Sequence, residues 1–310
     1  MSKKFISTKM KIFLLVLLIL SIIFYASGCI VLVQSNCNIL DYSDEIHFNP
    51  DSFKYNLDFK NNFLNFTNSY SSHNYEINDN ISEIDLNMNS QNIEIVNTEN
   101  KFLNIKIKSF SSSNTELNLS QSNNKMTFSP TVDIPDSAEI ILSIPLELAD
   151  KITLKLTTSS GDINLNNYSS NTVNASSANG DINLNNCNLN YLYSSSSSGD
   201  INMNSVNSHV ETNVSSLSGT INGTGNFSVF TGSTSSGDIN IDFENKLNNL
   251  FISSISGDID LCIPSHCGYE INYNTLSGEL NTDETFMTNG DKSSTININT
   301  SSGDLNIKLK

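Results

Sequence analysis

The chain contains no arginine: all 16 of its basic residues are lysines, and they face 32 aspartates and glutamates, which gives a formal net charge of −16. Nucleic-acid binding depends on a basic surface that neutralises phosphates, so this charge balance excludes DNA and RNA as partners. The absence of arginine also removes the usual bidentate clamp for phosphate and carboxylate groups.

Tryptophan is also absent, and the four histidines are scattered along the chain, at His47, His73, His209 and His266. A polysaccharide-acting β-helix enzyme, which is one alternative function, needs clustered acids together with a base or a cation. No Ser/His/Asp, HExxH or phosphate-cradling pattern is present. The sequence therefore predicts a non-enzymatic protein with no catalytic residues and no cofactor.

Cysteine is scarce and odd in number, with five residues: Cys29, Cys37, Cys187, Cys262 and Cys267. This count offers no even disulfide framework. Cys262 and Cys267 could form a disulfide if the four residues between them turn back, but free thiols are the alternative, because a bridge needs specific Cα geometry. With His266 they would make only an incomplete zinc set.

Charge is missing from residues 12–33, an apolar run of 22 residues that follows four lysines. Such a run is long enough to cross a bilayer as a helix, and lysines upstream favour a cytoplasmic N-terminus. We therefore predict a cytoplasmic tail at 1–11 and a transmembrane anchor at 12–33.

Two other interpretations of this N-terminal segment stay open. Ala26-Ser27-Gly28-Cys29 resembles a bacterial lipoprotein cleavage box, in which Cys29 would be lipidated, and a cleaved secretion signal is the third possibility. Ala26 stands where leucine is usual, and the apolar run continues past Cys29. All three interpretations place residues 38–310 outside the cytoplasmic membrane.

The C-terminal half contains eight copies of a Ser-Gly-Asp-Ile-like motif, spaced 18 to 25 residues apart. Their glycines are Gly161, Gly180, Gly199, Gly219, Gly237, Gly257, Gly278 and Gly303. A hydroxyl residue stands three positions before each glycine, and Ile or Leu stands two positions after it. Apolar residues alternate on odd positions before the glycine and on even positions after it. This change of phase predicts a corner between two strands, for which glycine is suited because it reaches positive φ.

One such unit cannot bury its own apolar face, but a stack of units can. The sequence therefore predicts an all-β protein with a parallel β-solenoid over residues 150–310, in which equivalent residues of successive units lie above one another. A sandwich of antiparallel hairpins is the alternative. Residues 79–149 are predicted to form a β-strand cap or early coils, and residues 34–78 a stalk or irregular β structure.

An acidic column follows the glycines and offers candidate calcium ligands: Asp162, Asp181, Asp200, Asp238, Asp258 and Asp304, with Glu279 in the same position. Calcium ions bound to these side chains would reduce the electrostatic repulsion between neighbouring carboxylates of the column. Carboxylates that are solvated, or that bind backbone N–H groups, are the favoured alternative. Ligand or ice binding by the hydroxyl column is disfavoured, because its parity points inward, where mutual hydrogen bonding of hydroxyls is expected. The abundance of asparagine is interpreted as a composition bias without functional meaning.

The runs ILSIPLELADKITLKLTTSSGDINL (141–165) and DLCIPSHCGYEINYNTLSGEL (260–280) share an Ile-Pro, a strand and a Ser-Gly-acid corner. With the eight repeats, they resemble the DUF4097 family of bacterial β-strand-repeat proteins, described as candidate adhesins, over roughly residues 80–310. The resemblance implies a membrane-tethered, extracytoplasmic domain without established enzymatic chemistry, acting in surface attachment or envelope stress. It offers no catalytic residues to transfer.

We therefore expect a protein of the cytoplasmic membrane whose C-terminal domain lies at the cell surface. The membrane is the expected partner of the N-terminal helix, and an unknown surface or envelope component is the expected partner of the solenoid. The alternatives are a β-helix enzyme acting on polysaccharide and a calcium-stabilised binding module.

Overall fold

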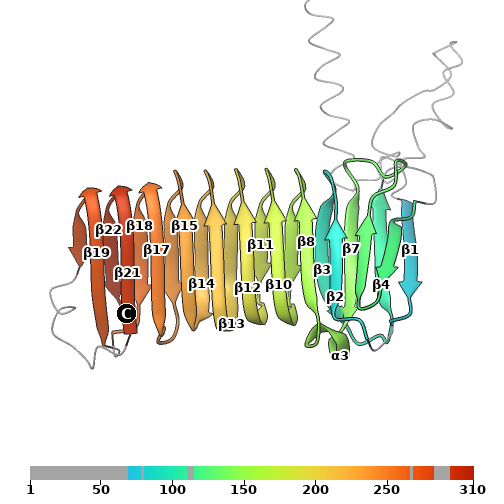
Figure 1. The fold of residues 1–310 in the computed structure, drawn as a ribbon, viewed down its shortest axis with the longest axis horizontal. Coiled ribbons are helices and arrows are strands. Elements are labelled where there is room, and N and C mark those ends of the chain that lie inside the picture. The colour runs from blue at the N-terminus through green and yellow to red at the C-terminus, as the bar shows by residue number, and fades with distance from the viewer. Residues whose placement is uncertain (1–68, 78–79, 110–114, 266–267, 283–293) are drawn as a thin grey trace, which may run out of the picture. The chain divides into compact units, whose positions relative to one another are not determined.

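The computed structural model describes residues 69–77, 80–109, 115–265, 268–282 and 294–310. These residues form a long stack of strands with one short helix, α3 (Leu146–Ala149) (Figure 1). In this part of the chain, no helix is long and apolar enough to cross a membrane. The predicted anchor at 12–33 and the lipidation candidate Cys29 lie outside it.

The strands form two facing sheets, joined coil by coil. In spatial order, the first sheet contains β5 (Asn118–Ser122), β6 (Lys125–Ser129), β2 (Glu83–Asn87), β8 (Thr153–Thr158), β10 (Ser169–Ser177), β12 (Asn188–Ser196), the second half of β13 (Ile201–Ser216), β15 (Val229–Thr234), β17 (Asn249–Ser256), β21 (Ser294–Ser302) and β19 (Tyr269–Ser277). The second sheet contains β1 (Ser69–Tyr75), β4 (Leu103–Ser109), β7 (Glu139–Pro145), β3 (Asn92–Thr98), β9 (Ile163–Asn166), β11 (Ile182–Asn185), the first half of β13, β14 (Ile221–Phe227), β16 (Ile239–Phe243), β18 (Ile259–Ile263), β22 (Leu305–Leu309) and β20 (Leu280–Thr282).

Like residues stack on like, as the repeat predicts. Ile182 is in parallel register with Ile163 on one side and with Ile201 on the other. The same column continues through Ile221, Ile239, Ile259 and Leu305, and all of its members down to Leu305 are fully buried. Parallel pairing between successive coils rules out the sandwich of antiparallel hairpins.

Each coil turns at two places. The first is the Ser-Gly-Asp corner, where the buried parity changes as predicted. The second follows the short strand of the second sheet, where Asn167, Asn186 and Ser205 adopt a left-handed conformation with φ of 51° to 53°. Asparagine tolerates this region better than most residues. The expected polar return is therefore a tight turn, and the next strand begins two residues after Asn167.

The corner glycines are required for a reason other than the predicted one. Of the eight, Gly257 and Gly303 have positive φ, of 153° and 146°. At every corner, however, an added Cβ would overlap the backbone carbonyl oxygen of the coil beneath, as Gly180 shows with Gly161. Close approach of two backbones, rather than left-handed conformation, therefore selects glycine at this column.

The order of the last coils differs from the sequence order. β21 and β22 lie between β17 and β18 on one side and β19 and β20 on the other, so the C-terminal strands are not the outermost ones (Figure 1). The glycine column follows the same order, because the Cβ of Gly303 would meet Gly257 and that of Gly278 would meet Gly303. Successive repeats therefore stack in sequence order only as far as Gly257.

The N-terminal end also departs from a plain repeat. The first coil consists of β2 and β3, whose corner position is Gln91, so the stack begins upstream of residue 150. Beyond it lie β6 and β7, followed by the antiparallel strands β5, β4 and β1. Ser69–Tyr75, within the segment expected to be a stalk or irregular β structure, is the antiparallel edge of this cap, whereas residues 34–68 lie outside the described part.

In the core, large side chains pack beside small ones. Phe227, Phe230 and Phe243 are buried in edge-to-face contact, with ring centroids 5.3 to 5.9 Å apart. Gly232 leaves room for the Phe230 ring, because an added Cβ would lie 2.9 Å from it. Large and small residues in neighbouring coils therefore fill one continuous core.

We predict that Gly199→Ala lowers the free energy of unfolding by about 3 kcal/mol, because the new Cβ would overlap the Gly180 carbonyl, which is backbone and cannot rotate away. Gly223→Ala is the matched control. Its Cβ would lie 2.9 Å from Ile241 Cδ1 and 3.2 Å from Met203 Cε, which are mobile side-chain ends, so about 1 kcal/mol is expected. Urea unfolding of both variants measures the difference, and equal losses would contradict the close-approach argument.

We also predict a loss of stability at alkaline pH that originates at Cys187. Burial raises the pKa of this thiol from 9.0 to about 11. Above pH 9 the unfolded chain releases the proton first, so stability falls between about pH 9 and 11, by up to roughly 1.4 kcal/mol per pH unit. Cys187→Val, the residue type of the equivalent Val206, should reduce this slope, whereas Cys262→Ala should change it less. Unfolding curves from pH 7 to 11 test this, and an unchanged slope in Cys187→Val would refute it.

Candidate binding surface

The Ser-Gly-Asp corner is held by its own hydroxyl group. The backbone N–H of Gly180 donates to Ser177 Oγ at 2.8 Å, and the N–H of Gly199 donates to Ser196 Oγ at 2.9 Å. Ser177 Oγ in turn donates to the carbonyl oxygen of Gly161, in the coil beneath, at 3.3 Å. The expectation of mutual hydrogen bonding within the hydroxyl column is therefore wrong: these hydroxyls bind backbone groups of the corners.

The acidic column forms a ladder of hydrogen bonds between coils. Asp162 Oδ1 accepts the backbone N–H of Asp181 at 2.9 Å, and Asp181 Oδ1 accepts that of Asp200 at 2.8 Å. The same contact joins the other corners: Asn92 to Asp162, Asp200 to Thr220, Asp238 to Asp258, Asp258 to Asp304 and Asp304 to Glu279. Each carboxylate thus satisfies a backbone donor that the turn leaves unpaired, which offsets repulsion along the file.

This geometry agrees with the interpretation of the column as backbone-bonded carboxylates. One oxygen of Asp162, Asp181, Asp200, Asp238, Asp258 and Asp304 is committed to the next coil. Within the described residues, no three His, Cys, Asp or Glu side chains gather in a way that could hold a metal ion. Calcium binding by the second carboxylate oxygens stays an untested prediction.

The outer face of the second sheet carries amide ladders that the sequence analysis missed. Asn183 Nδ2 donates to Asn164 Oδ1 at 3.0 Å, and the row continues at the same distance through Asn202, Asn222 and Asn240. A second row joins Asn166, Asn185 and Asn204, also at 3.0 Å. Recurrence of Asn at one column, three after the glycine, was the available signal. The interior members of each row donate one N–H to one neighbour and accept one from the other, and each keeps a second N–H.

The outer face of the first sheet is different, because it gathers aromatic and apolar side chains. Phe251 is 44% exposed, and Ile255 and Leu217, near the corner edge, are 59% and 57% exposed. Tyr191 and Tyr193, two residues apart on β12, therefore lie on the same face of the strand, and both are half-buried. Such side chains mark contact surfaces more often than charged ones do.

A shallow hollow of about 250 Å³ crosses this face over four neighbouring coils. It is lined in part by Lys155, Asn174, Tyr193, Ser195 and Asn213. Tyr193 Oη donates to Glu211 Oε2 at 3.2 Å, and partial burial, together with that carboxylate, raises the pKa of the phenol. The hollow therefore combines a cation, amides, hydroxyls and an oriented aromatic ring.

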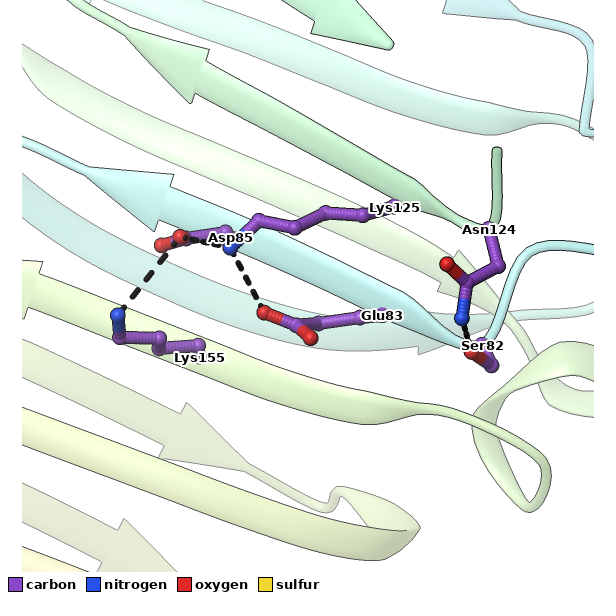
Figure 2. A network of polar contacts seen from close by, with 6 residues as sticks. All are labelled: Ser82, Glu83, Asp85, Asn124, Lys125 and Lys155. Atoms are coloured by element: carbon purple, nitrogen blue, oxygen red, sulfur yellow. Dashed lines mark hydrogen bonds and ion pairs between the residues drawn. The ribbon is translucent and has the colours of Figure 1, made fainter. Parts of the chain in front are cut away.

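At its N-terminal end the first sheet carries a charged network (Figure 2). Lys125 Nζ lies 2.8 Å from Glu83 Oε1 and 2.7 Å from Asp85 Oδ2, and these hydrogen bonds raise the lysine pKa. Lys155 Nζ approaches Asp85 at 3.8 Å. The network spans β6, β2 and β8 and therefore joins the cap to the solenoid. Its two lysines neutralise the charge of its two carboxylates.

Cys267, the candidate disulfide partner of Cys262, lies outside the described residues, as does His266. Cys262 is partly buried on β18, where burial, and then the charge of Asp242, raise the pKa of its thiol. It lines a shallow hollow of about 330 Å³ on the second sheet with Asp260 and Lys308. Among the remaining histidines, His209 lies on β13 and contacts Asn188, whereas His73 lies on β1 in the cap.

A family model, Toastrack DUF4097, matches residues 81–308. Two solved structures are similar: a provisionally named adhesin from Bacteroides fragilis NCTC 9343, and a provisionally named cell adhesion protein from Clostridium sporogenes ATCC 15579. The first is 12% identical, with a TM-score of 0.45, and the match covers 78% of this chain and 99% of that one. The second is 13% identical, with a TM-score of 0.29, and the match covers 79% of this chain and 100% of that one. Both scores are too low to support a functional argument. No curated protein matches the chain.

We predict that Asp200→Ala lowers the free energy of unfolding by about 1 to 2 kcal/mol, because it leaves the backbone N–H of Thr220 without its acceptor. Asp200→Asn should cost less than about 0.5 kcal/mol, since it keeps the oxygen and removes one charge from the file. Asn92, which accepts the N–H of Asp162 at 2.9 Å, shows that an amide fits this position. Urea unfolding compares the two, and a larger loss for the asparagine variant would show that charge matters more than the acceptor.

Proposed function

The chain belongs to the Toastrack DUF4097 family, and from this premise we propose that it is a non-enzymatic protein of the cell envelope. Residues 12–33 tether it to the cytoplasmic membrane. The solenoid stands on the outer side of that membrane and binds a surface or envelope partner through the outer face of the first sheet.

The contrast between the two outer faces carries this proposal. On the second sheet, the outer face is covered by asparagine amides that bond one another at 3.0 Å in rows along the solenoid axis. On the first sheet, exposed Phe251, Ile255 and Leu217 accompany Tyr193 and its hollow. A partner that covers apolar and aromatic side chains gains free energy that a polar amide surface, which must lose its water, does not offer.

The size of this face suits a macromolecular partner rather than a small molecule. Nine parallel strands, from β2 to β19, form it, and at about 4.8 Å per strand they span roughly 40 Å. The hollow is shallow, whereas small-molecule sites are usually enclosed pockets of larger volume. A rigid, extended and mostly polar plane fits adhesion or envelope scaffolding.

The non-enzymatic part of the proposal is supported by how the charged groups are distributed. The corner acids occur one per coil along a column and bind backbone N–H groups, and the charged network of Figure 2 is neutral overall. A hydrolase would instead need a pair of acids whose environments push their pKa values apart.

Site-specific photocrosslinking in intact cells tests the proposal. A photoreactive residue in place of Tyr193 or Phe251, on the first sheet, should yield a crosslinked partner in the membrane fraction. The matched control replaces Asn183, at the centre of the amide row on the second sheet, and should yield at least several-fold less product. Equal crosslinking from both faces, or crosslinking from Asn183 alone, would contradict the assignment of the face, and recovery in a soluble cytoplasmic fraction would contradict the tether.

A further inference from the structure

The C-terminal end of the solenoid is an open edge. β19 pairs with β21 and β20 pairs with β22, and within the described residues no strand pairs with their other sides (Figure 1). The apolar columns end here without cover. Leu280 is 37% exposed where Leu305, one coil inward, is fully buried.

The same loss of cover is visible along β19. Ile271 and Tyr273 point to the core side of the strand and are only partly buried, whereas Ile296 and Ile298, their neighbours on β21, are fully buried. A nine-residue edge strand with partly exposed inner side chains offers both backbone groups and apolar surface to another strand.

The N-terminal end lacks these properties. Its edge strands, β1 and β5, run antiparallel to their neighbours, and all five residues of β5 are exposed. The apolar residues of the adjacent strand β6, Met126 and Phe128, are fully covered. If copies joined head to tail, the uncovered core at the C-terminal end of one copy would meet β5 of the next, which has no buried face. An indefinite filament is therefore disfavoured.

We propose that two copies of the chain join through their open ends, with β19 of one copy pairing antiparallel with β19 of the other about a two-fold axis at Tyr273. Because this register pairs odd positions with odd ones, the inner face of each strand meets the inner face of the other. Ile271 then lies opposite Thr275 of the second copy, and the two Tyr273 side chains lie opposite each other.

The register is also compatible in charge and hydrogen bonding. Glu270 lies opposite Leu276 of the second copy, so no two carboxylates face each other across the pair. Asn272 lies opposite Asn274 of the second copy. Each of these amides donates one N–H to its inner neighbour, Asn297 or Asn299, and retains a second N–H for the partner. The interface is thus self-complementary, as a two-fold contact must be.

Charge reversal across the Asn272–Asn274 pair tests this arrangement. Sedimentation of the purified full chain, held in a mild detergent because residues 12–33 are apolar, should give the mass of two chains. The double variant Asn272→Lys/Asn274→Lys, and separately Asn272→Glu/Asn274→Glu, should sediment as single chains, because each places like charges opposite each other. Mixing the two variants should restore a species of two chains that contains one copy of each.

The matched control is Asn213→Lys/Ser215→Lys, which makes the same changes at the same two columns in the middle of the first sheet and should leave the dimer intact. Restoration on mixing shows that the single variants are folded. A wild-type chain that sediments as one copy at all concentrations would overturn the proposal, since the end would then be covered from within the chain. Larger assemblies, or a dimer that survives the lysine pair, would overturn it as well.

Discussion

The structure depends on how closely successive coils approach at the Ser-Gly-Asp corner. There, the backbone of one glycine lies against the carbonyl oxygen of the glycine beneath it, with no room for a Cβ between them. This contact fixes the vertical spacing of the coils at one edge. The register of every strand follows from it: the hydroxyl before the glycine and the carboxylate after it reach the backbone of neighbouring coils only when the glycines are superposed.

The same constraint explains how an acidic chain tolerates a file of carboxylates. Each Asp of the column binds an N–H group of the next corner, so its negative charge lies beside a backbone donor. The amide rows of the second sheet also form hydrogen bonds between successive coils, but through uncharged groups. Polar side chains therefore help hold the coils together on the outside, while isoleucine and leucine columns do so within. On the outer face of the first sheet, amide pairs occur on β10 and β12 and on β19 and β21, and aromatic side chains lie among them.

Much of the fold could be predicted from the sequence, because burial parity and turn chemistry are local. The positions of Ile163, Ile182 and Ile201 in one column follow directly from the repeat, and so does the corner at each glycine. The amide rows were missed, since asparagine is abundant everywhere and only the three-dimensional stacking separates a row from a composition bias. The order of the last coils was missed for a different reason: spacings of 21 and 25 residues after Gly257 allow either coil to dock first. The predicted membrane anchor at 12–33 and the lipidation candidate Cys29 lie beyond the residues that the structure describes.

The position of β21 and β22 inside the stack has a consequence for biosynthesis. β21 and β22 form the rung on which β19 and β20 rest, so that outermost rung cannot form until residues 294–309 have left the ribosome. Until then, the growing stack ends at β17 and β18. β19 and β20 have already been synthesised, but the strands with which they pair have not. A chain cut short before residue 294 would lose both final rungs, not one.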